Sequence, residues 1–282
     1  MKRILITGAN SYIGTSFEKY IKNNFLNDYV VDTVDLVDGS WRESSFSGYD
    51  SVFHVAGIAH QKETRENAGL YYEVNRDLAI DVAKKAKADG VRQFVFLSSM
   101  SVYGKDTGVI TKDTVPSPRS NYGKSKFQAE KGMSELADDT FRVCTLRPPM
   151  VYGKGCKGNF NGVCNLVKKL PVFPRVKNKR SMVYIDNLSS FVKLCVDNDL
   201  SGLYFPQNAE YVSTMEMAQG IALAMRKRIA FGYLMGCAVC ILRLFYPTAK
   251  KGFGSLIYRD TEDFDFSYVV VDNKKSFTDS VL

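Results

Sequence analysis

The chain has 282 residues, of which 45% are hydrophobic, and a formal net charge of +8. This length and apolar content exclude an intrinsically disordered chain and allow one large domain, or a main domain with a smaller lobe. The positive charge alone is compatible with nucleic acid, a membrane surface or an anionic small substrate, but no nucleic-acid-binding motif accompanies it, so we predict no nucleic-acid partner.

The first half of the chain alternates short apolar runs with helical periods. Strands are predicted at residues 4–6, 30–36, 51–56, 93–97 and 142–146, and helices at 13–21, at 74–86 and from about residue 122. Strands that alternate with helices form a parallel sheet covered on both faces. We therefore predict an α/β fold with a Rossmann-type, doubly wound parallel sheet.

Beyond Arg147 the alternation becomes looser, with a strand at 182–185 and a helix that runs through Cys195. We predict a dinucleotide-binding domain of residues 1–150, joined by 182–208. Residues 151–181 and 209–282 would form a smaller, interleaved C-terminal lobe that binds the substrate.

Residues 229–242 form an uncharged, mostly apolar run between Arg228 and Arg243, too short to span a bilayer. We expect a buried helix or a segment that covers the substrate; an interfacial membrane contact is the less favoured alternative. Cys237 and Cys240 form a CxxC here without a second pair, so no metal site is predicted. The N-terminal apolar run is too short for a signal peptide and the six cysteines are sparse, so we expect a soluble, cytoplasmic protein.

A glycine-containing loop joins the first predicted strand to the first helix. Backbone amides and a helix N-terminus at this place can hold a pyrophosphate. The residues predicted to bind the cofactor here are Gly8, Asn10, Ser11, Tyr12, Ile13 and Gly14. Asp35 follows about twenty residues after Gly14, where a carboxylate can accept hydrogen bonds from ribose hydroxyls, which favours NAD over NADP.

A second group of residues has the pattern of acid–base chemistry. Ser99 follows a predicted strand, and Tyr122 and Lys126 are four residues apart on one face of a predicted helix. An ammonium group at that spacing can lower the pKa of the phenol and let it exchange a proton near neutral pH. We predict Ser99, Tyr122 and Lys126 as catalytic residues.

Together these motifs resemble the NAD-dependent epimerase/dehydratase family of extended short-chain dehydrogenases/reductases, and its UDP-glucose 4-epimerase-like members most closely. The loop resembles the family's TGxxGxxG motif, with Ser11 in place of the middle glycine, a change that could weaken or shift pyrophosphate binding. The resemblance further rests on SSxxVYG at residues 98–104, YGxSKxxxE at 122–130, HVAG at 54–57 and RPPMVYG at 147–153.

The resemblance implies roles for further residues and a homodimer. Ala56, Gly57, Asn75 and Pro149 would border the cofactor, together with Tyr122 and Lys126, with Asn75 at the start of a helix. The substrate, a UDP-sugar, would contact Ser99, Ser101, Tyr122, Asn159, Val172, Phe173 and Arg180. Arg180 would pair with the diphosphate, since guanidinium binds phosphate through two hydrogen bonds.

The choice of reaction rests on few positions. Family members that dehydrate the sugar carry an Asp-Glu pair where this chain has Met100 and Ser101, so hydride chemistry at C4 is favoured. Epimerisation and reduction of a 4-keto sugar use the same three side chains, and Asp35 favours retained NAD and hence an epimerase. A non-catalytic nucleotide-binding regulator is the alternative from a different class, motivated by Ser11 and the short C-terminal lobe.

Overall fold

The computed structural model describes residues 1–59, 61–259 and 277. These residues divide into two compact units. Unit 1 comprises Met1–Gly104, Pro116–Pro148 and Leu188–Pro206; unit 2 comprises Lys105–Val115, Pro149–Asn187 and the described part of Gln207–Leu282. The chain therefore passes between the units several times.

Unit 1 is built on a sheet of six parallel strands, which confirms the predicted fold class. The strands are β1 (Lys2–Thr7), β2 (Tyr29–Val34), β3 (Ser51–His54), β4 (Gln93–Leu97), β6 (Arg142–Leu146) and β10 (Gly202–Tyr204), in the spatial order β2-β1-β3-β4-β6-β10. Every residue of β3 and β4 is buried, as expected for strands covered on both faces. The order of the strands reverses between β1 and β3, and ligands of such sheets bind beyond the carboxyl ends of the strands at that point.

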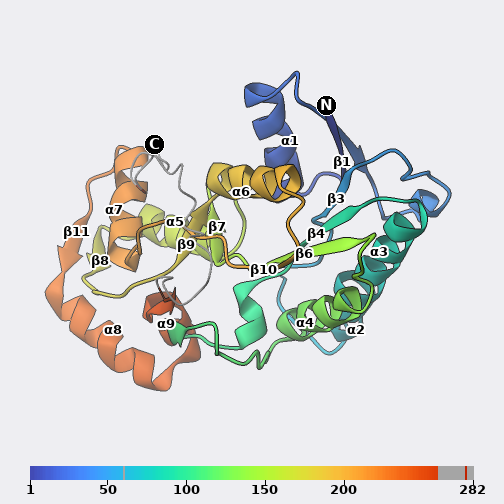
Figure 1. The fold of residues 1–282 in the computed structure, drawn as a ribbon. Helices are drawn as coiled ribbons and strands as arrows, with labels where there is room; N and C mark the ends of the chain where they lie inside the picture. Colours follow the sequence, from blue (N-terminus) through green and yellow to red (C-terminus); the bar gives the residue numbers. More distant parts are fainter. Residues whose placement is uncertain (60, 260–276, 278–282) are drawn as a thin grey trace. The chain divides into compact units, whose positions relative to one another are not determined.

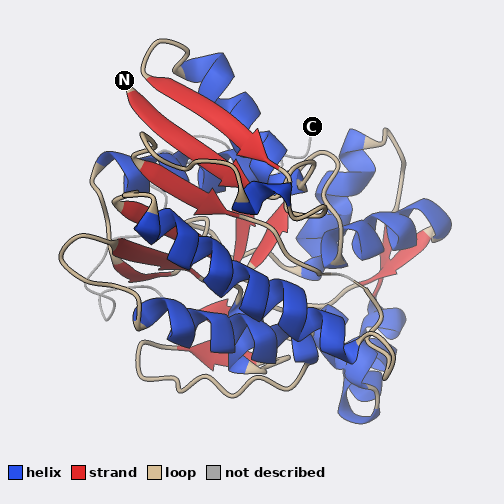
Figure 2. Ribbon diagram, turned by 90° about the vertical axis from the view of Figure 1, so that its right-hand side faces the viewer, coloured by secondary structure: helices blue, strands red, loops and turns tan. Residues whose placement is uncertain are grey.

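Helices cover both faces of this sheet. In Figure 1, α1 and α6 lie on one face and α2, α3 and α4 on the other, and Figure 2 shows the strands in red against these helices. The helical elements are α1 (Tyr12–Asn24), η1 (Ser40–Arg42), α2 (Ala68–Tyr72), η2 (Glu73–Leu78), α3 (Ala79–Ala88), η3 (Met100–Tyr103), α4 (Asn121–Ser134) and α6 (Ile185–Asp197), the last belonging to unit 1 from Leu188 on. The core between sheet and helices includes Trp41, Phe94 and Phe141.

Unit 2 contains three small pairs of parallel strands and four helices among its described residues. The pairs are β5 (Gly108–Ile110) with β12 (Leu256–Tyr258), β7 (Met150–Tyr152) with β9 (Met182–Tyr184), and β8 (Val172–Pro174) with β11 (Ala230–Gly232). The helices are α5 (Asn159–Lys169), α7 (Thr214–Ala224), α8 (Tyr233–Phe245) and α9 (Pro247–Phe253). Tyr152, Phe160 and Phe277 form an aromatic cluster in its core.

Two boundaries differ from the sequence prediction because strand pairing decides them. Residues 182–187 lie in unit 2 and not in the dinucleotide-binding domain, since β9 pairs with β7. Residues 105–115 also belong to unit 2, since β5 pairs with β12, a strand nearly 150 positions further along the chain. Periodicity reports local structure and contains no information on such distant pairings.

The apolar segment 229–242 forms β11 and most of α8. We expected its helix to be buried, but it is largely exposed. Leu234, Ile241 and Phe245 are 82%, 60% and 72% exposed, and Cys237 and Cys240 are exposed on the same helix. Across the described residues, no helix combines the length and the apolar character that a membrane crossing requires.

Candidate functional site

The loop between β1 and α1 is shaped by close packing against the end of β3. Gly8 has a φ of +117°, and a Cβ atom there would lie 2.7 Å from the backbone nitrogen of Ala56. Only glycine fits this conformation and this contact without strain. The loop thus stands at the reversal of strand order, directly before the N-terminus of α1, as a pyrophosphate site requires.

Ser11 has a structural role that the family motif did not suggest. It is the N-cap of α1, and its Oγ accepts a hydrogen bond of 3.2 Å from the backbone N–H of Gly14. Its side chain is thereby engaged by the first turn of the helix, which begins at Tyr12 and continues through Ile13. Asn10 takes a φ of 60°, in the left-handed region that asparagine tolerates.

Asp35 lies one residue beyond β2, which ends two residues earlier than predicted. Its side chain is exposed, and Oδ1 accepts a hydrogen bond of 3.0 Å from the backbone N–H of Val37. The carboxylate therefore stands at the carboxyl edge of the sheet, on the strand next to β1. This placement suits a contact to the adenosine ribose.

The end of β3 gathers three more of the predicted residues. A Cβ atom on Gly57 would lie 2.8 Å from Oδ1 of Asn75 and 3.2 Å from Nζ of Lys126. Asn75 accepts from the backbone N–H of Ile58 (2.7 Å) and donates to its carbonyl oxygen (3.0 Å), which holds the chain after Gly57 in place. At both Gly8 and Gly57 the chain packs against its neighbours without room for a Cβ atom, so these two turns require glycine.

The family resemblance implied that Asn75 starts a helix, but the structure does not place it there. It is fully buried within η2, a π-helical turn between α2 and α3. Such turns are rare and frequent at functional sites. Its described hydrogen bonds go to Ile58 and Ser125, so it positions the loop after β3.

Ser99 and Tyr122 come from two elements that approach each other closely. Ser99 caps η3, with Oγ accepting from the N–H of Ser101 (3.1 Å), and its side chain acts to lower the pKa of Tyr122. The approach depends on Gly123, because a Cβ atom there would lie 2.6 Å from the carbonyl oxygen of Ser101. The Tyr-Gly pair of the motif therefore has a steric reason.

The start of α4, which carries Tyr122, is held by two caps. Ser120 is the N-cap, accepting from the N–H of Gly123 at 3.0 Å. The carboxylate of Glu63 accepts from the N–H groups of Asn121 (2.9 Å) and Tyr122 (3.1 Å). Glu63 was not predicted from the sequence, because it lies 59 positions before Tyr122 and has no motif of its own.

Lys126 is buried one turn after Tyr122 on α4. Its Nζ donates to the carbonyl oxygen of Leu97 (2.9 Å) and lies 4.7 Å from the ring centre of Phe96. Burial lowers the pKa of Lys126 to about 8, while the nearby carboxylate of Glu130 acts in the opposite direction. This ammonium group is therefore fixed at the carboxyl end of β4.

The pKa of Tyr122 differs from our expectation. Burial raises it, the side chain of Ser99 acts to lower it, and Tyr71 raises it further. The effect of burial outweighs that of Ser99, and the Nζ of Lys126 donates to the Leu97 carbonyl. The group in the structure that favours ionisation of the phenol is Ser99.

A buried ionic network stands behind these residues, and the sequence analysis missed it. Arg147 binds Glu130 through two hydrogen bonds, from Nε (3.0 Å) and Nη2 (2.6 Å), and Nη1 donates to the hydroxyl of Tyr103 (2.8 Å). Ser98 donates to the same carboxylate. The sequence signals for this network were an Arg directly after β6 and a Glu four residues after Lys126.

A cavity of about 530 Å³ lies beside this network, lined by Phe127 and Glu130 among others. The three predicted catalytic side chains do not line it.

His54 and Pro149 lie in buried surroundings. His54 is in the core of unit 1, where Nδ1 is 2.8 Å from Oγ1 of Thr7, and burial lowers its pKa to about 3. This agrees with a packing role. Pro149, a predicted cofactor contact, is buried just after the strand end that carries Arg147.

The predicted substrate residues of unit 2 have varied surroundings. Asn159 is the exposed first residue of α5, and Val172 is partly buried. The ring of Phe173 is fully buried against Phe231 and Phe253, so it is not free to contact a base.

Arg180 is buried too, and Nη1 donates to the carbonyl oxygen atoms of Lys251 (2.9 Å) and Gly254 (3.0 Å). This guanidinium nitrogen holds the end of α9. Its pKa is lowered, chiefly by burial.

Comparison with known proteins agrees with this architecture. A model of the NAD dependent epimerase/dehydratase family matches residues 4–203. A UDP-glucose 4-epimerase from Vibrio cholerae is 33% identical over 254 residues, which cover 80% of this chain and 76% of the relative. An N-acetyl-alpha-D-glucosaminyl-diphospho-ditrans,octacis-undecaprenol 4-epimerase from Escherichia coli O157:H7 is 28% identical over 218 residues, covering 71% and 64%. Among solved structures, a dTDP-4-dehydrorhamnose reductase from Clostridium acetobutylicum has a TM-score of 0.68 at 21% identity, covering 82% of this chain and 83% of its own, and shares the fold.

Proposed function

Because the chain belongs to the NAD-dependent epimerase/dehydratase family, we propose that it is a 4-epimerase of a UDP-sugar that works through a transient 4-keto sugar. The observation that supports this most strongly is the grouping of Ser99, Tyr122 and Lys126 at the carboxyl end of β4. The similarity to a UDP-glucose 4-epimerase points to the same substrate class.

The dinucleotide would be held by residues whose geometry suits it. NAD is the cofactor of this family. The loop of Gly8 to Gly14 would receive the pyrophosphate, Asp35 the adenosine ribose, and Gly57 with Lys126 the nicotinamide end. When bound, NAD supplies a hydride acceptor for C4 of the sugar and later a hydride donor to its other face.

The side chains of unit 1 would manage the proton. Tyr122 would take the proton of the 4-hydroxyl as the C4–H bond breaks, and would return it when that bond forms again, so that sugar and enzyme regain their starting states. Ser99 would bind the reacting oxygen and lower the pKa of Tyr122, which burial raises. Lys126 would bind the nicotinamide ribose, as the family resemblance implies.

The substrate contacts outside this group are proposals with unequal support. Ser101 is exposed beside Ser99, and Asn159 and Val172 retain accessible surface, so we keep them as candidates. Phe173 and Arg180 would need their present packing to change before their side chains reach a nucleotide.

The test is NMR of UDP-glucose, UDP-galactose and their N-acetyl forms with purified protein and no added cofactor. Interconversion is the expected result; a requirement for NADPH and a 4-keto sugar would indicate a reductase instead. Tyr122→Phe should lower turnover by about 10²–10⁴-fold while NAD binding is retained. Tyr72→Phe is the matched control, since it removes a phenol that bonds to the neighbouring Asn121. If the wild type binds NAD, turns over none of these substrates and is indistinguishable from Tyr122→Phe, the non-catalytic regulator is supported.

A second substrate class belongs in the same assay. The relative from Escherichia coli O157:H7 is named for a sugar diphosphate on an undecaprenol chain, and the exposed apolar side chains of α8 would suit a lipid-bearing substrate. If N-acetylglucosaminyl-diphospho-undecaprenol is epimerised and UDP-sugars are not, the UDP-sugar assignment is wrong and the C4 chemistry stands.

A further inference from the structure

The helix α8 has a composition that ordinarily requires burial. Of its 13 residues only Arg243 is charged, and the others are apolar, aromatic, glycine or cysteine. A helix that is apolar on all sides normally lies inside a protein. In α8, however, Gly236 is the one buried residue, and Tyr233, Leu234 and Leu244 are more than two-thirds exposed.

One side of α8 is fixed to unit 2, which determines the side that faces outward. Gly236 lies so close to β8 that a Cβ atom would be 2.2 Å from the carbonyl oxygen of Arg175. Arg243, seven residues later on the same side, donates to the carbonyl oxygen of Phe253 at 3.0 Å. The opposite side therefore presents Leu234, Ile241 and Phe245, which share one face of the helix.

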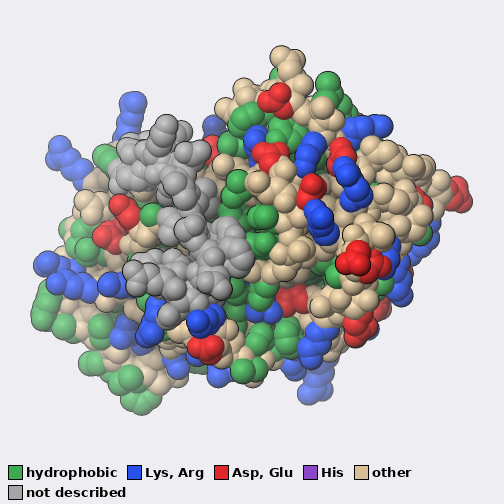
Figure 3. Space-filling model, viewed as in Figure 1, with side chains coloured by type: hydrophobic (Ala, Val, Ile, Leu, Met, Phe, Trp, Pro, Cys, Tyr) green, Lys and Arg blue, Asp and Glu red, His purple; other side chains and the backbone are tan. Residues whose placement is uncertain are grey.

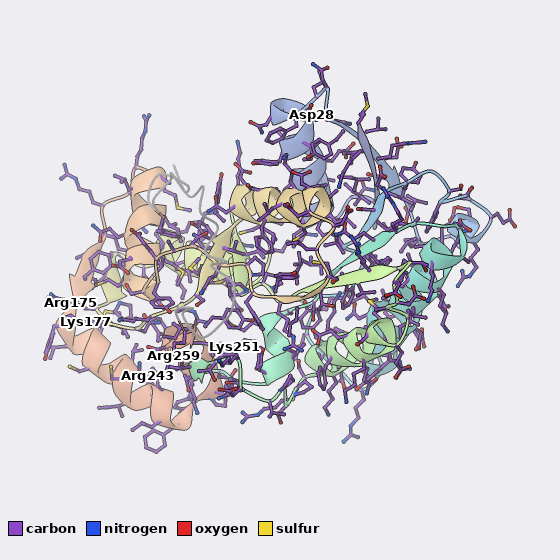
Figure 4. All side chains as sticks on the ribbon, viewed as in Figure 1. Asp28, Arg175, Lys177, Arg243, Lys251 and Arg259 are labelled. Atoms are coloured by element: carbon purple, nitrogen blue, oxygen red, sulfur yellow. The ribbon has the colours of Figure 1, made fainter. Side chains whose placement is uncertain are left out.

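The described residues around this apolar face are mostly basic. Residues 217–259 contain no Asp or Glu and seven Lys or Arg residues. Arg175 and Lys177, from the chain that follows β8, are exposed as well. Figure 4 labels these two residues with Arg243, Lys251 and Arg259 around α8, and Figure 3 shows green and blue side chains together in this region.

We propose that α8 and the exposed basic residues Arg175, Lys177, Lys251 and Arg259 form a surface that binds the face of a bilayer containing anionic phospholipids. At 13 residues α8 is about 20 Å long, short of the roughly 30 Å hydrocarbon core, so it would lie in the plane of the interface. Apolar residues would enter the boundary of the acyl chains while lysines and arginines contact headgroup phosphates.

The charge decides between a bilayer and a second copy of the chain. Two copies that meet through α8 would bring two basic, acid-free segments together, and like charges at such a contact oppose association. An anionic bilayer has the complementary sign. This inference reverses our sequence-based preference for a buried segment, since 229–242 contains the exposed face.

The experiment is vesicle co-sedimentation of the full-length protein. Vesicles of phosphatidylcholine with roughly one third phosphatidylglycerol should bind the wild type, with weaker binding at high salt and to pure phosphatidylcholine. The triple variant Leu234→Gln, Ile241→Gln and Phe245→Gln should lose at least about tenfold in partition coefficient. A matched variant, Leu26→Gln with Val37→Gln, removes exposed apolar residues elsewhere and should bind like the wild type.

A second variant and a spectroscopic measurement make the result decisive. Arg175→Gln with Lys177→Gln should weaken binding and reduce its salt dependence without altering α8. A polarity-sensitive dye on the exposed Cys240 should shift to shorter wavelength when vesicles are added. Absence of wild-type binding, or equal binding by the α8 triple variant with native circular dichroism, overturns the proposal. A dimer that the triple variant dissociates, with no vesicle binding, shows that a second copy covers α8.

Discussion

Removal of the Arg147 guanidinium tests the buried network behind the catalytic residues. The side chains of Arg147 and Glu130 are only 7% and 8% exposed, and two hydrogen bonds join them. Arg147→Met would leave the buried Glu130 carboxylate without the opposite charge that is hydrogen-bonded to it. Breaking a buried pair in this way costs about 3–5 kcal/mol. At roughly 2–4 °C per kcal/mol for a protein of this size, the melting temperature should fall by about 6–20 °C.

The single tryptophan provides the assay. Trp41 is buried in unit 1, the unit that contains the network, so urea denaturation followed by its fluorescence reports on the correct part of the chain. The double variant Glu130→Met with Arg147→Met removes both charges and should be more stable than Arg147→Met alone. If Arg147→Met costs less than about 1 kcal/mol, or if the double variant loses the sum of the two single losses, the pair is not buried and coupled as described.

Three further predictions concern the site itself. Glu130→Gln removes the charge that raises the pKa of Lys126, so this pKa should fall below its present value of about 8. If activity needs the ammonium form, the alkaline limb of the pH–rate profile should move to lower pH, and an unmoved alkaline limb contradicts this. Ser11→Ala should destabilise the protein by about 1 kcal/mol and Ser11→Gly by only a few tenths, because Ser11 caps α1, and equal losses in urea denaturation would refute that role. Gly8→Ala should reduce bound NAD in the purified protein, since its Cβ would meet the backbone of Ala56, and unchanged NAD content would argue against this loop as the binding site.

The proposed catalytic group could be named from the sequence because its residues lie in short local motifs. Tyr122 and Lys126 are separated by one helical turn, and Ser99 lies two residues after a short apolar run that predicts a buried strand. Gly8 and Asp35 were predicted for the same reason, since each directly follows the end of a strand. Local spacing and periodicity determine such features wherever the chain folds into these elements.

The tertiary structure determined which residues from distant parts of the chain contact the proposed catalytic group. Glu63 caps the helix of Tyr122, and burial raises the pKa of its phenol. The exposure of α8 belongs to the same class, since composition indicates burial and only the packing of Gly236 on β8 leaves the opposite face outward. Sequence patterns determine which side chains an element presents, whereas contacts between elements remote in sequence determine their partners, their pKa values and their access to solvent.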